Sequence, residues 1–456
     1  MSRAARSAVD TAAAVRAGEL SVAGLVEEAL AACREAHTRT NCFVEIDADA
    51  ALAAARLADQ DRNQGVLAGV PYAFKDMFTR QGRRPGLGVR GALVTTRAAD
   101  STCLNRLDAA GAIPLGRLNL DPYGYTATGL NPELGDVRNP WRPDHIAGGS
   151  SSGAAAAVAA GALPLAVGSD TAGSVRIPAA LCGVVGLKPT YGRVPRTGCI
   201  PLSYSQDTIG IVARTVEDAA LTLAVMGGHD PADPSSFDAP APAFAPPAGG
   251  RPLDGLRVGV DEHYLRELCA PEVLAAVLHA RDVLSDLGAR TVPVSLAGLS
   301  RYDVAASVLT WCEAGAVHEA GLVREPGAYP GPVRARLRQA LTAHGTDHVN
   351  AMRVRGAALR EFLGGVLDRC DVIATCATPT PAPRADETAA DPLPITARLL
   401  SANRPFNFLG LPAITVPAGF APGDLPLGLQ LVARPWAEHL ILRAAAAYQH
   451  TTKESQ

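Results

Sequence analysis

The pattern of apolar and polar positions along the 456-residue chain changes repeatedly between helical and strand-like spacing. Residues 8–36 carry apolar side chains at helical spacing, broken near Gly18 and restarted after Ser21, which predicts two N-terminal helices. From Leu67 onward, short β-type runs (VPYAF, AIPLG, PLAVG, CGVVGLKP) alternate with helical segments at 101–110 and 153–161. This alternation predicts an α/β fold with a large mixed β-sheet core flanked by helices on both faces.

A composition break at residues 227–255 interrupts this pattern. The segment is rich in Pro, Ala and Asp and has no periodicity, which is typical of a linker or a long surface loop. Beyond it, LRVGV, DVIATC and PAITVPAG are strand-like, whereas 272–288 and 332–369 have helical spacing. We therefore expect a single domain over 1–456. It comprises N-terminal helices in 1–66, a core in 67–226, the loop at 227–255, and a part at 256–456 that completes the same body.

Composition and charge exclude several classes of protein. The chain is 48% hydrophobic and 19% charged with a net charge of −3, so it has the balance of a globular protein and no basic patch for a nucleic acid. The N-terminus lacks an apolar signal segment, and the longest apolar run, Ala154 to Val167, is too short to span a bilayer. We expect a cytoplasmic protein with no membrane and no nucleic-acid partner.

The nine cysteines are scattered without C-x-x-C or zinc-finger spacing. We expect reduced, structural thiols, no metal requirement and no cofactor.

The candidate chemistry lies in GGSSSGAAAAVAAGALPLAVGSDTAGSVRIP, residues 148–178, and in the upstream segment GVPYAFKDMF. A flexible linker does not continue into an apolar helix and strand, and the phosphate-loop pattern GxxxxGK[ST] is absent. GxSxG is met at Ser151, but the preceding RPDHIAG is a poor strand for a nucleophile elbow. No histidine lies between His145 and His229. The arrangement that uses all parts is Ser150 and Ser174 together with Lys75.

This joint pattern closely resembles the amidase signature family. The resemblance extends through GRLNLDPYGYTATGLNPELGDVRNPW, FNFLGLPAITVPAGF and DLPLGLQLVARPW, and so covers nearly the whole chain. It implies the amidase signature fold and a hydrolase that cleaves a linear carboxamide C–N bond through an acyl-enzyme, releasing ammonia or an amine.

The resemblance also implies roles for individual residues. Ser174 is expected to be the nucleophile, Ser150 the bridging serine that follows a cis peptide bond, and Lys75 the base. The oxyanion hole is expected at the amides of Thr171, Ala172, Gly173 and Ser174. Supporting residues are expected to be Ser151, Asp170 and Arg176, with recognition of a substrate carboxylate as the alternative for Arg176. Candidate substrate contacts are Tyr123, Tyr125, Ile200, Tyr204 and the 311–319 region, whereas Asp207 and His145 are expected to be structural.

These roles are chemically coherent. A serine hydroxyl becomes an effective nucleophile when a base removes its proton, and a second hydroxyl can accept that proton while it donates its own. Lys75 must be neutral to act as the base. Burial of its ammonium group among Tyr72, Ala73, Phe74 and Met77 would lower its pKa in the required direction.

Three functions are compatible with this pattern. The leading interpretation is a stand-alone amidase that acts on a small-molecule amide, with a homodimer expected from the resemblance. The alternative is the glutaminase (A) subunit of a tRNA-dependent amidotransferase complex. Such subunits tend to read DEFAMGSSTEN where this chain reads DPYGYTATGLN, and they carry an acidic residue that ARLLSANRPFNFLGLP lacks. A non-catalytic scaffold is disfavoured, because it has no reason to keep Lys75, Ser150 and Ser174 together.

Overall fold

One mixed sheet runs through the molecule. The computed structural model describes residues 6–60, 65–92, 99–246 and 249–453. Within them, eleven strands are hydrogen-bonded in the order β1-β3-β2-β4-β6-β5-β10-β11-β9-β7-β8. Their bounds are β1 Phe43–Ile46, β2 Pro71–Lys75, β3 Ile113–Leu118, β4 Leu165–Asp170, β5 Val185–Lys188, β6 Thr208–Ala213, β7 Arg257–Val260, β8 Arg290–Pro293, β9 Val372–Cys376, β10 Ala413–Ala421 and β11 Leu425–Ala433.

Both pairing directions occur in this sheet. β2 is parallel to β3 and β4, and β7 is parallel to β8 and β9, while the central pairs from β4 through β11 to β9 are antiparallel. Strands from both halves of the sequence share the sheet, because β5 pairs with β10. The expectation of a large mixed sheet is therefore confirmed.

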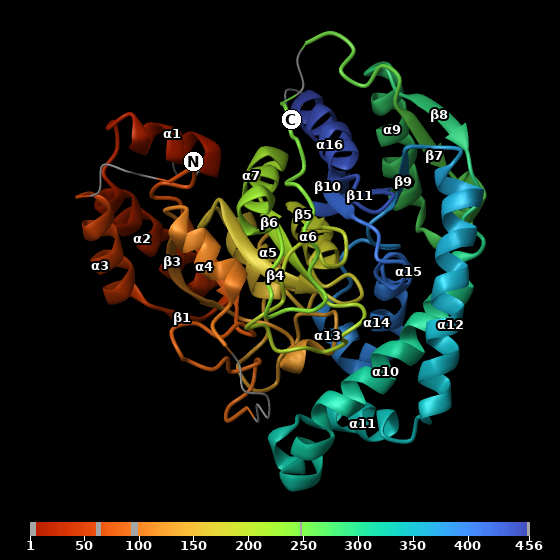
Figure 1. Cartoon of the computed structure of the whole chain (residues 1–456), viewed down its shortest axis with the longest axis horizontal. Helices are drawn as coiled ribbons and strands as arrows, with labels where there is room; N and C mark the ends of the chain where they lie inside the picture. The colour runs from red at the N-terminus through yellow and green to blue at the C-terminus, as the bar shows by residue number, and fades with distance from the viewer. Residues whose placement is uncertain (1–5, 61–64, 93–98, 247–248, 454–456) are drawn as a thin grey trace.

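Helices cover both faces of the sheet (Figure 1). Their bounds are α1 Ala8–Arg16, α2 Val22–Thr40, α3 Ala48–Ala58, α4 Thr102–Ala109, α5 Ser152–Ala159, α6 Arg176–Cys182, α7 Val216–Met226, α8 Glu262–Leu268, α9 Pro271–Asp286, α10 Leu299–Arg324, α11 Gly331–Ala340, α12 Gly345–Phe362, α13 Ala385–Ala390, α14 Pro392–Ser401, α15 Arg404–Phe408 and α16 Glu438–Lys453. Short turns of other helix types lie at Pro122–Gly124, Pro326–Ala328 and Leu363–Leu367.

The strand residues alternate between the two layers, as the period of two requires. In β2, Tyr72 and Phe74 belong to the core that α4, α7, α9 and α16 cover. Ala73 points the other way, into the core formed with α2, α3 and α5. A third core lies on the second half of the sheet, where α10, α12 and α15 pack. The small residues of α5, which include Ala155 and Ala156, allow this buried helix to pack closely against its neighbours.

Most elements anticipated from periodicity are present, including the two N-terminal helices α1 and α2. Residues 1–5 and 61–64 of the predicted 1–66 segment, and 247–248 of the predicted loop, lie outside the described residues. The described part of 227–255 contains no helix or strand. It is less exposed than expected, because Asp230, Asp233 and Ser236 are buried and Phe237 N donates to Gly192 O. Periodicity did not predict the 26-residue α10.

All nine cysteines lie within the described residues as free thiols, and six of them are buried. Burial raises the pKa of the Cys42 thiol to about 11, which disfavours the reactive thiolate. No described helix is long and apolar enough to cross a membrane.

The contact between α6 and β11 predicts the effect of a core substitution. A Cβ on Gly428 would lie 2.7 Å from the Ala180 Cβ and 3.1 Å from the Ala377 Cβ. Neither atom can rotate away, so we expect Gly428→Ala to lower the free energy of unfolding in urea by about 1–3 kcal/mol. Gly364→Ala, which meets nothing within 4 Å, is the control. Equal stability of the two variants would contradict this close packing.

Candidate active site

Lys75 is the last residue of β2, and its side chain has no exposed surface. Its Nζ donates to Ser150 Oγ at 2.7 Å and to Ser169 Oγ at 3.0 Å. β2 and β4 are parallel neighbours, so their carboxyl ends meet at the same edge of the sheet and bring Lys75 beside Ser169. The chain therefore places a buried amine against two hydroxyl groups.

Ser150 and Ser174 lie in adjacent loops. The Gly149–Ser150 peptide is cis, and Ser151 N donates to Ser174 O at 3.0 Å. Ser151 Oγ donates to Ser169 O at 3.1 Å, so Ser151 links the Ser150 loop to β4. Ser174 is 5% exposed. The structure thus brings the two predicted serines and the predicted lysine into one region.

Burial sets the charge state of the amine. Desolvation lowers the pKa of Lys75 to about 8, although Asp121, Cys199, Asp170 and Asp207 act in the opposite direction. A lysine with this pKa is partly neutral near neutral pH, as a general base requires.

Asp170 and Arg176 form a fully buried ion pair at the two ends of the loop that carries Ser174. Arg176 Nε donates to Asp170 Oδ2 at 3.0 Å, and Nη1 donates to Gln430 Oε1 at 2.7 Å. Burial opposes ionisation of Asp170, but the adjacent Arg176 guanidinium holds the pKa of that carboxyl well below its ordinary value. The Arg176 side chain has no exposed surface and does not line the pocket of Ser174, which agrees with its expected role of bracing the loop.

The backbone amides after β4 have distinct partners. Gly173 N donates to Asp170 Oδ1 at 2.8 Å, so this amide, expected in the oxyanion hole, is already engaged. Asp207 accepts from Thr171 Oγ1 at 2.6 Å and from Leu202 N at 2.8 Å. These contacts fix the loop around Ala172, and they agree with a structural role for Asp207.

Ser174 lines a pocket formed by segments far apart in the sequence. The pocket is lined by Gly124, Tyr125, Thr126, Thr171, Ala172, Ser174, Leu202, Ser307, Thr310, Trp311, Arg336, Leu400 and Arg404. Of the expected substrate contacts, Tyr125 and Trp311 lie here. None of the lining residues is acidic.

The other three expected substrate contacts lie elsewhere. Tyr123 is buried, stacks on Tyr329 and donates its hydroxyl to Ala328 O. Ile200 is buried in the core, and Tyr204 is half exposed outside the pocket lining. Tyr123 and Tyr125 differ because Tyr123 adopts a positive φ of 55°, a turn that the sequence does not reveal.

Two arginines define the charge of the pocket. Arg404 forms a bidentate ion pair with Asp303, with distances of 2.7 and 2.6 Å. Arg336 lies over the Tyr125 ring at 4.6 Å from its centroid and donates to Tyr125 O at 3.0 Å. Among the described residues Arg336 has no ion-pair partner, and burial lowers its pKa. The Tyr125 hydroxyl is buried and also lacks a hydrogen-bond partner there.

Several of these functional residues escaped sequence reasoning. Ser169 precedes the predicted Asp170 in the same motif. Its spacing of two from Val167 along β4 places both side chains on the same face of the strand, and this spacing could have indicated Ser169. Asn407 and Gln430, which hold Arg176, lie in the C-terminal segments that carry the family resemblance. Arg336 had no local signal, since it lies on an arginine-rich helix of ordinary appearance.

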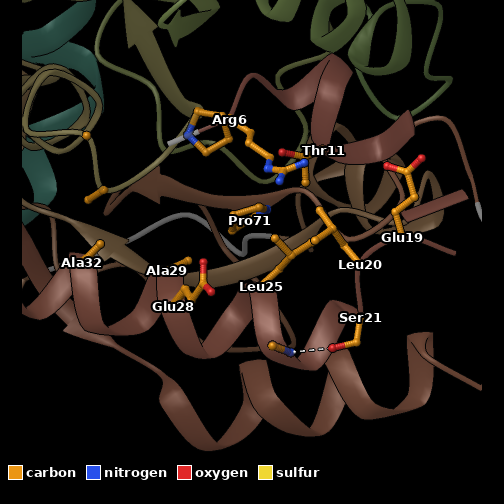
Figure 2. A pocket seen from close by; sticks show the side chains of 14 residues that line it. Arg6, Thr11, Glu19, Leu20, Ser21, Leu25, Glu28, Ala29, Ala32 and Pro71 are labelled. Carbon is orange, nitrogen blue, oxygen red and sulfur yellow. Dashed lines mark hydrogen bonds between the residues drawn. The ribbon is translucent and has the colours of Figure 1, made fainter. Parts of the chain in front are cut away.

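A separate hollow lies between α1, α2 and the start of β2 (Figure 2). The charged side chains around it, Arg6, Glu19 and Glu28, are exposed. None of Lys75, Ser150 and Ser174 lines it. This hollow therefore has no part in the candidate chemistry.

Comparison with known proteins identifies the kinship of the chain. The family model described as Amidase matches residues 24–442. The A-type subunit of glutamyl-tRNA(Gln) amidotransferase from Roseiflexus castenholzii is 38% identical, with 95% of this chain and 93% of that protein aligned. A chain from an inhibitor-bound structure, described as a vestigial protein complex that reveals the evolutionary origins of an s-triazine catabolic enzyme, is 32% identical. Its TM-score is 0.88, and the match covers 98% of this chain and 99% of that chain.

A bacterial aryl acylamidase of the amidase signature family also matches, with 26% identity and a TM-score of 0.86 over 98% of this chain and 96% of that chain.

These findings correct one expectation. A partner set limited to a small-molecule amide, without nucleic acid, is contradicted by relatives that are named as subunits of an enzyme acting on glutamyl-tRNA(Gln). The differences in short motifs that seemed to exclude this kinship are outweighed by similarity over almost the whole chain. The resemblance and the fold inferred from sequence are confirmed, and the amide-hydrolase activity follows from them. The chain belongs to the amidase family.

Proposed function

We propose that the chain cleaves the carboxamide of a small, carboxylate-bearing substrate and releases ammonia, with glutamine as the first candidate. The observation that carries this proposal is the cation of Arg336, which has no ion-pair partner among the described residues and lines the same pocket as Ser174. A substrate carboxylate would satisfy this guanidinium through a charge-assisted pair.

In the proposed first step, Ser174 Oγ attacks the carboxamide carbon. Its proton passes to Ser150 Oγ, while Ser150 passes its own proton to Lys75 Nζ. The 2.7 Å contact between Lys75 and Ser150 supports this relay. The developing oxyanion would be held by the amides of Thr171, Ala172 and Ser174, and such donors are typically worth about 3–4 kcal/mol each.

In the proposed second step, the C–N bond breaks and the leaving nitrogen takes the proton back along the same path. An acyl-enzyme on Ser174 remains. Water then attacks the ester carbon and gives its proton to Lys75 through Ser150. The bond between the acyl carbon and Ser174 Oγ breaks, Ser174 Oγ takes the proton back along the same path, and the carboxylate product leaves. No metal or cofactor takes part in this sequence of proton transfers.

Besides the cation of Arg336, the pocket has hydroxyl groups that can accept hydrogen bonds. The Tyr125 hydroxyl lacks a partner among the described residues, and the side chains of Ser307 and Thr310 also line the pocket. Hydroxyl oxygens can accept from the ammonium of glutamine, although no carboxylate lines the pocket to neutralise it. This absence favours a second candidate, a carboxylated amide without an ammonium group.

The likeness to amidotransferase subunits supports a role within an assembly. We propose that the chain supplies ammonia to a partner that amidates glutamyl-tRNA(Gln), since its relatives are named as A subunits of glutamyl-tRNA(Gln) amidotransferase. Free thiols at all nine cysteines support a cytoplasmic site of action. Amidation of Glu-tRNA(Gln) by the remaining subunits, with and without this chain, tests the role.

Removal of the proposed base or nucleophile should abolish turnover. We expect Lys75→Met and Ser174→Ala to lower amide hydrolysis about 10²–10⁴-fold, because serine then lacks its base or is absent. Ammonia release is the measurement, with circular dichroism as the check on folding. Lys188→Met is the matched control, since Lys188 is equally buried but donates to Pro189 O. Normal turnover by either active-site variant would refute the assigned roles.

The pH dependence follows from the charge of Lys75. The neutral amine is the active form and its pKa is about 8, so kcat/KM should rise with pH and level off above that value. At pH 6 we expect about a hundredfold lower rate than on the plateau, since the neutral fraction falls tenfold per pH unit. A rate that falls between pH 6 and 8 would contradict a neutral lysine base.

Substrate charge can be tested with a matched pair of amides. Arg336→Met should lower kcat/KM for glutamine and for glutaramate, which lacks the ammonium group, by about 10–100-fold each. The exposed Arg338→Met on the same helix is the control. Faster wild-type hydrolysis of glutaramate than of glutamine would favour the second candidate. If Arg336→Met left kcat/KM for both amides unchanged, Arg336 would not bind the substrate carboxylate.

A further inference from the structure

Asp121 is a fully buried carboxylate that has no role in the reaction steps proposed above. It follows β3, and its Oδ2 accepts from Thr126 Oγ1 at 2.5 Å and from Thr128 N at 2.9 Å. Oδ1 accepts from Gly129 N at 2.9 Å. Asp121 therefore organises the segment 121–129, which carries Tyr125 into the pocket.

The same carboxylate lies against the peptide that precedes Ser150. A Cβ on Gly149 would lie 2.1 Å from Asp121 Oδ1, so glycine is needed for this approach. Asp121 N also donates to Ser150 O at 3.4 Å, and Gly124 N donates to Asp121 O at 2.8 Å. A Cβ on Gly124 would lie 3.5 Å from Ser150 Oγ and 3.9 Å from Lys75 Nζ. Asp121 thus holds both the Gly149–Ser150 peptide and Gly124, which lies beside the Lys75–Ser150 contact.

The carboxylate also acts on Lys75 as a charge. Asp121 has no arginine ion pair among the described residues, whereas Asp170 is paired with Arg176. Asp121 is the largest of the nearby charges that raise the pKa of Lys75, ahead of Cys199, Asp170 and Asp207. Burial raises the pKa of Asp121 itself, but Thr126, Thr128, Gly129 and Lys75 favour its ionised form.

We propose that Asp121 is a positioning residue of the amide-cleaving reaction, which fixes the Gly149–Ser150 peptide and supplies the counter-charge of Lys75. The proposal rests on the proposed function. Without Asp121, Lys75 would be a weaker base in a fully buried site, because desolvation alone disfavours the protonated amine. Proton transfer to a base of very low pKa is less favourable. By raising the pKa of Lys75, the carboxylate keeps this lysine an effective base near neutral pH.

The test is the isosteric variant Asp121→Asn. We expect the acidic limb of the pH profile of kcat/KM to move to lower pH by about one unit, because the amine loses its counter-charge. The plateau should also fall about tenfold or more, because Ser150 is less well held. The rate of Ser174 labelling by a fluorophosphonate, measured against pH, should show the same shift without any amide substrate.

Asp218→Asn is the matched control. Asp218 is also a fully buried carboxylate and accepts from Val9 N at 3.1 Å, but it is not among the charges acting on Lys75. Its variant should leave the acidic limb in place. A limb that stays in place in Asp121→Asn, whatever happens to the plateau, would overturn the proposal and leave a purely structural carboxylate.

A second pair of variants covers the case in which Asp121→Asn does not fold. Thr126→Val removes a hydroxyl donor to Asp121 Oδ2, and Thr126→Ser keeps it. We expect the plateau to fall severalfold for valine and to return for serine, with the acidic limb of both at its wild-type pH. Equal plateaus would contradict the positioning role. A wild-type protein that neither hydrolyses amides nor is labelled at Ser174 would refute the proposed function itself.

Discussion

The buried ion pair between Asp170 and Arg176 determines where the loop of Ser174, the proposed nucleophile, lies. Asp170 ends β4 and Arg176 begins α6, so the pair closes the five-residue turn that contains Ser174. Removing two charges from water is costly unless their remaining hydrogen bonds are also satisfied. Here Arg176 also donates to Asn407 Oδ1 and Gln430 Oε1, so the second half of the chain completes the pair. The position of the Ser174 loop therefore depends on the packing of the C-terminal half of the chain against the N-terminal half.

Burial alone does not make a lysine into a base, as the two buried lysines of this sheet illustrate. Desolvation lowers the pKa of Lys75 to about 8 and that of Lys188 to about 7. Lys188 donates to the backbone oxygen of Pro189, which has no proton to give. Lys75 donates to two hydroxyls, each of which can accept and donate. The hydroxyl partners, more than the shifted pKa, distinguish a proton relay from a structural amine.

The sequence predicted those parts of the molecule that depend on local patterns. Short β-type runs indicated β2 and β4. The glycine–serine stretch indicated Ser150 and Ser174, and together with the upstream segment GVPYAFKDMF and the family resemblance it indicated Lys75. The pocket was predicted poorly, because its walls come from α10, α11 and α15. Nothing near Arg336 in sequence says that it meets Tyr125, which lies more than two hundred positions upstream. Tyr123 does not line this pocket: it has a positive φ, and its ring stacks on Tyr329.

The proposed catalytic residues lie on the sheet, whereas most of the pocket wall lies on helices. Membership of the family therefore says more about the reaction than about the substrate. The lysine and the serines lie on β2, on β4 and in loops beside them, within the fold shared with an aryl acylamidase and with a chain of the vestigial complex related to s-triazine catabolism. The residues that a substrate would meet beyond the scissile bond lie largely on α10 and α11, and in the segment that Asp121 organises. Substitutions there can change the accepted acyl group while the ion pair and the relay stay in place. The cation of Arg336, which has no ion-pair partner in the part of the chain that the structure describes, is therefore more informative about the substrate than the catalytic motif is, because it belongs to the part of the pocket that the motif does not determine.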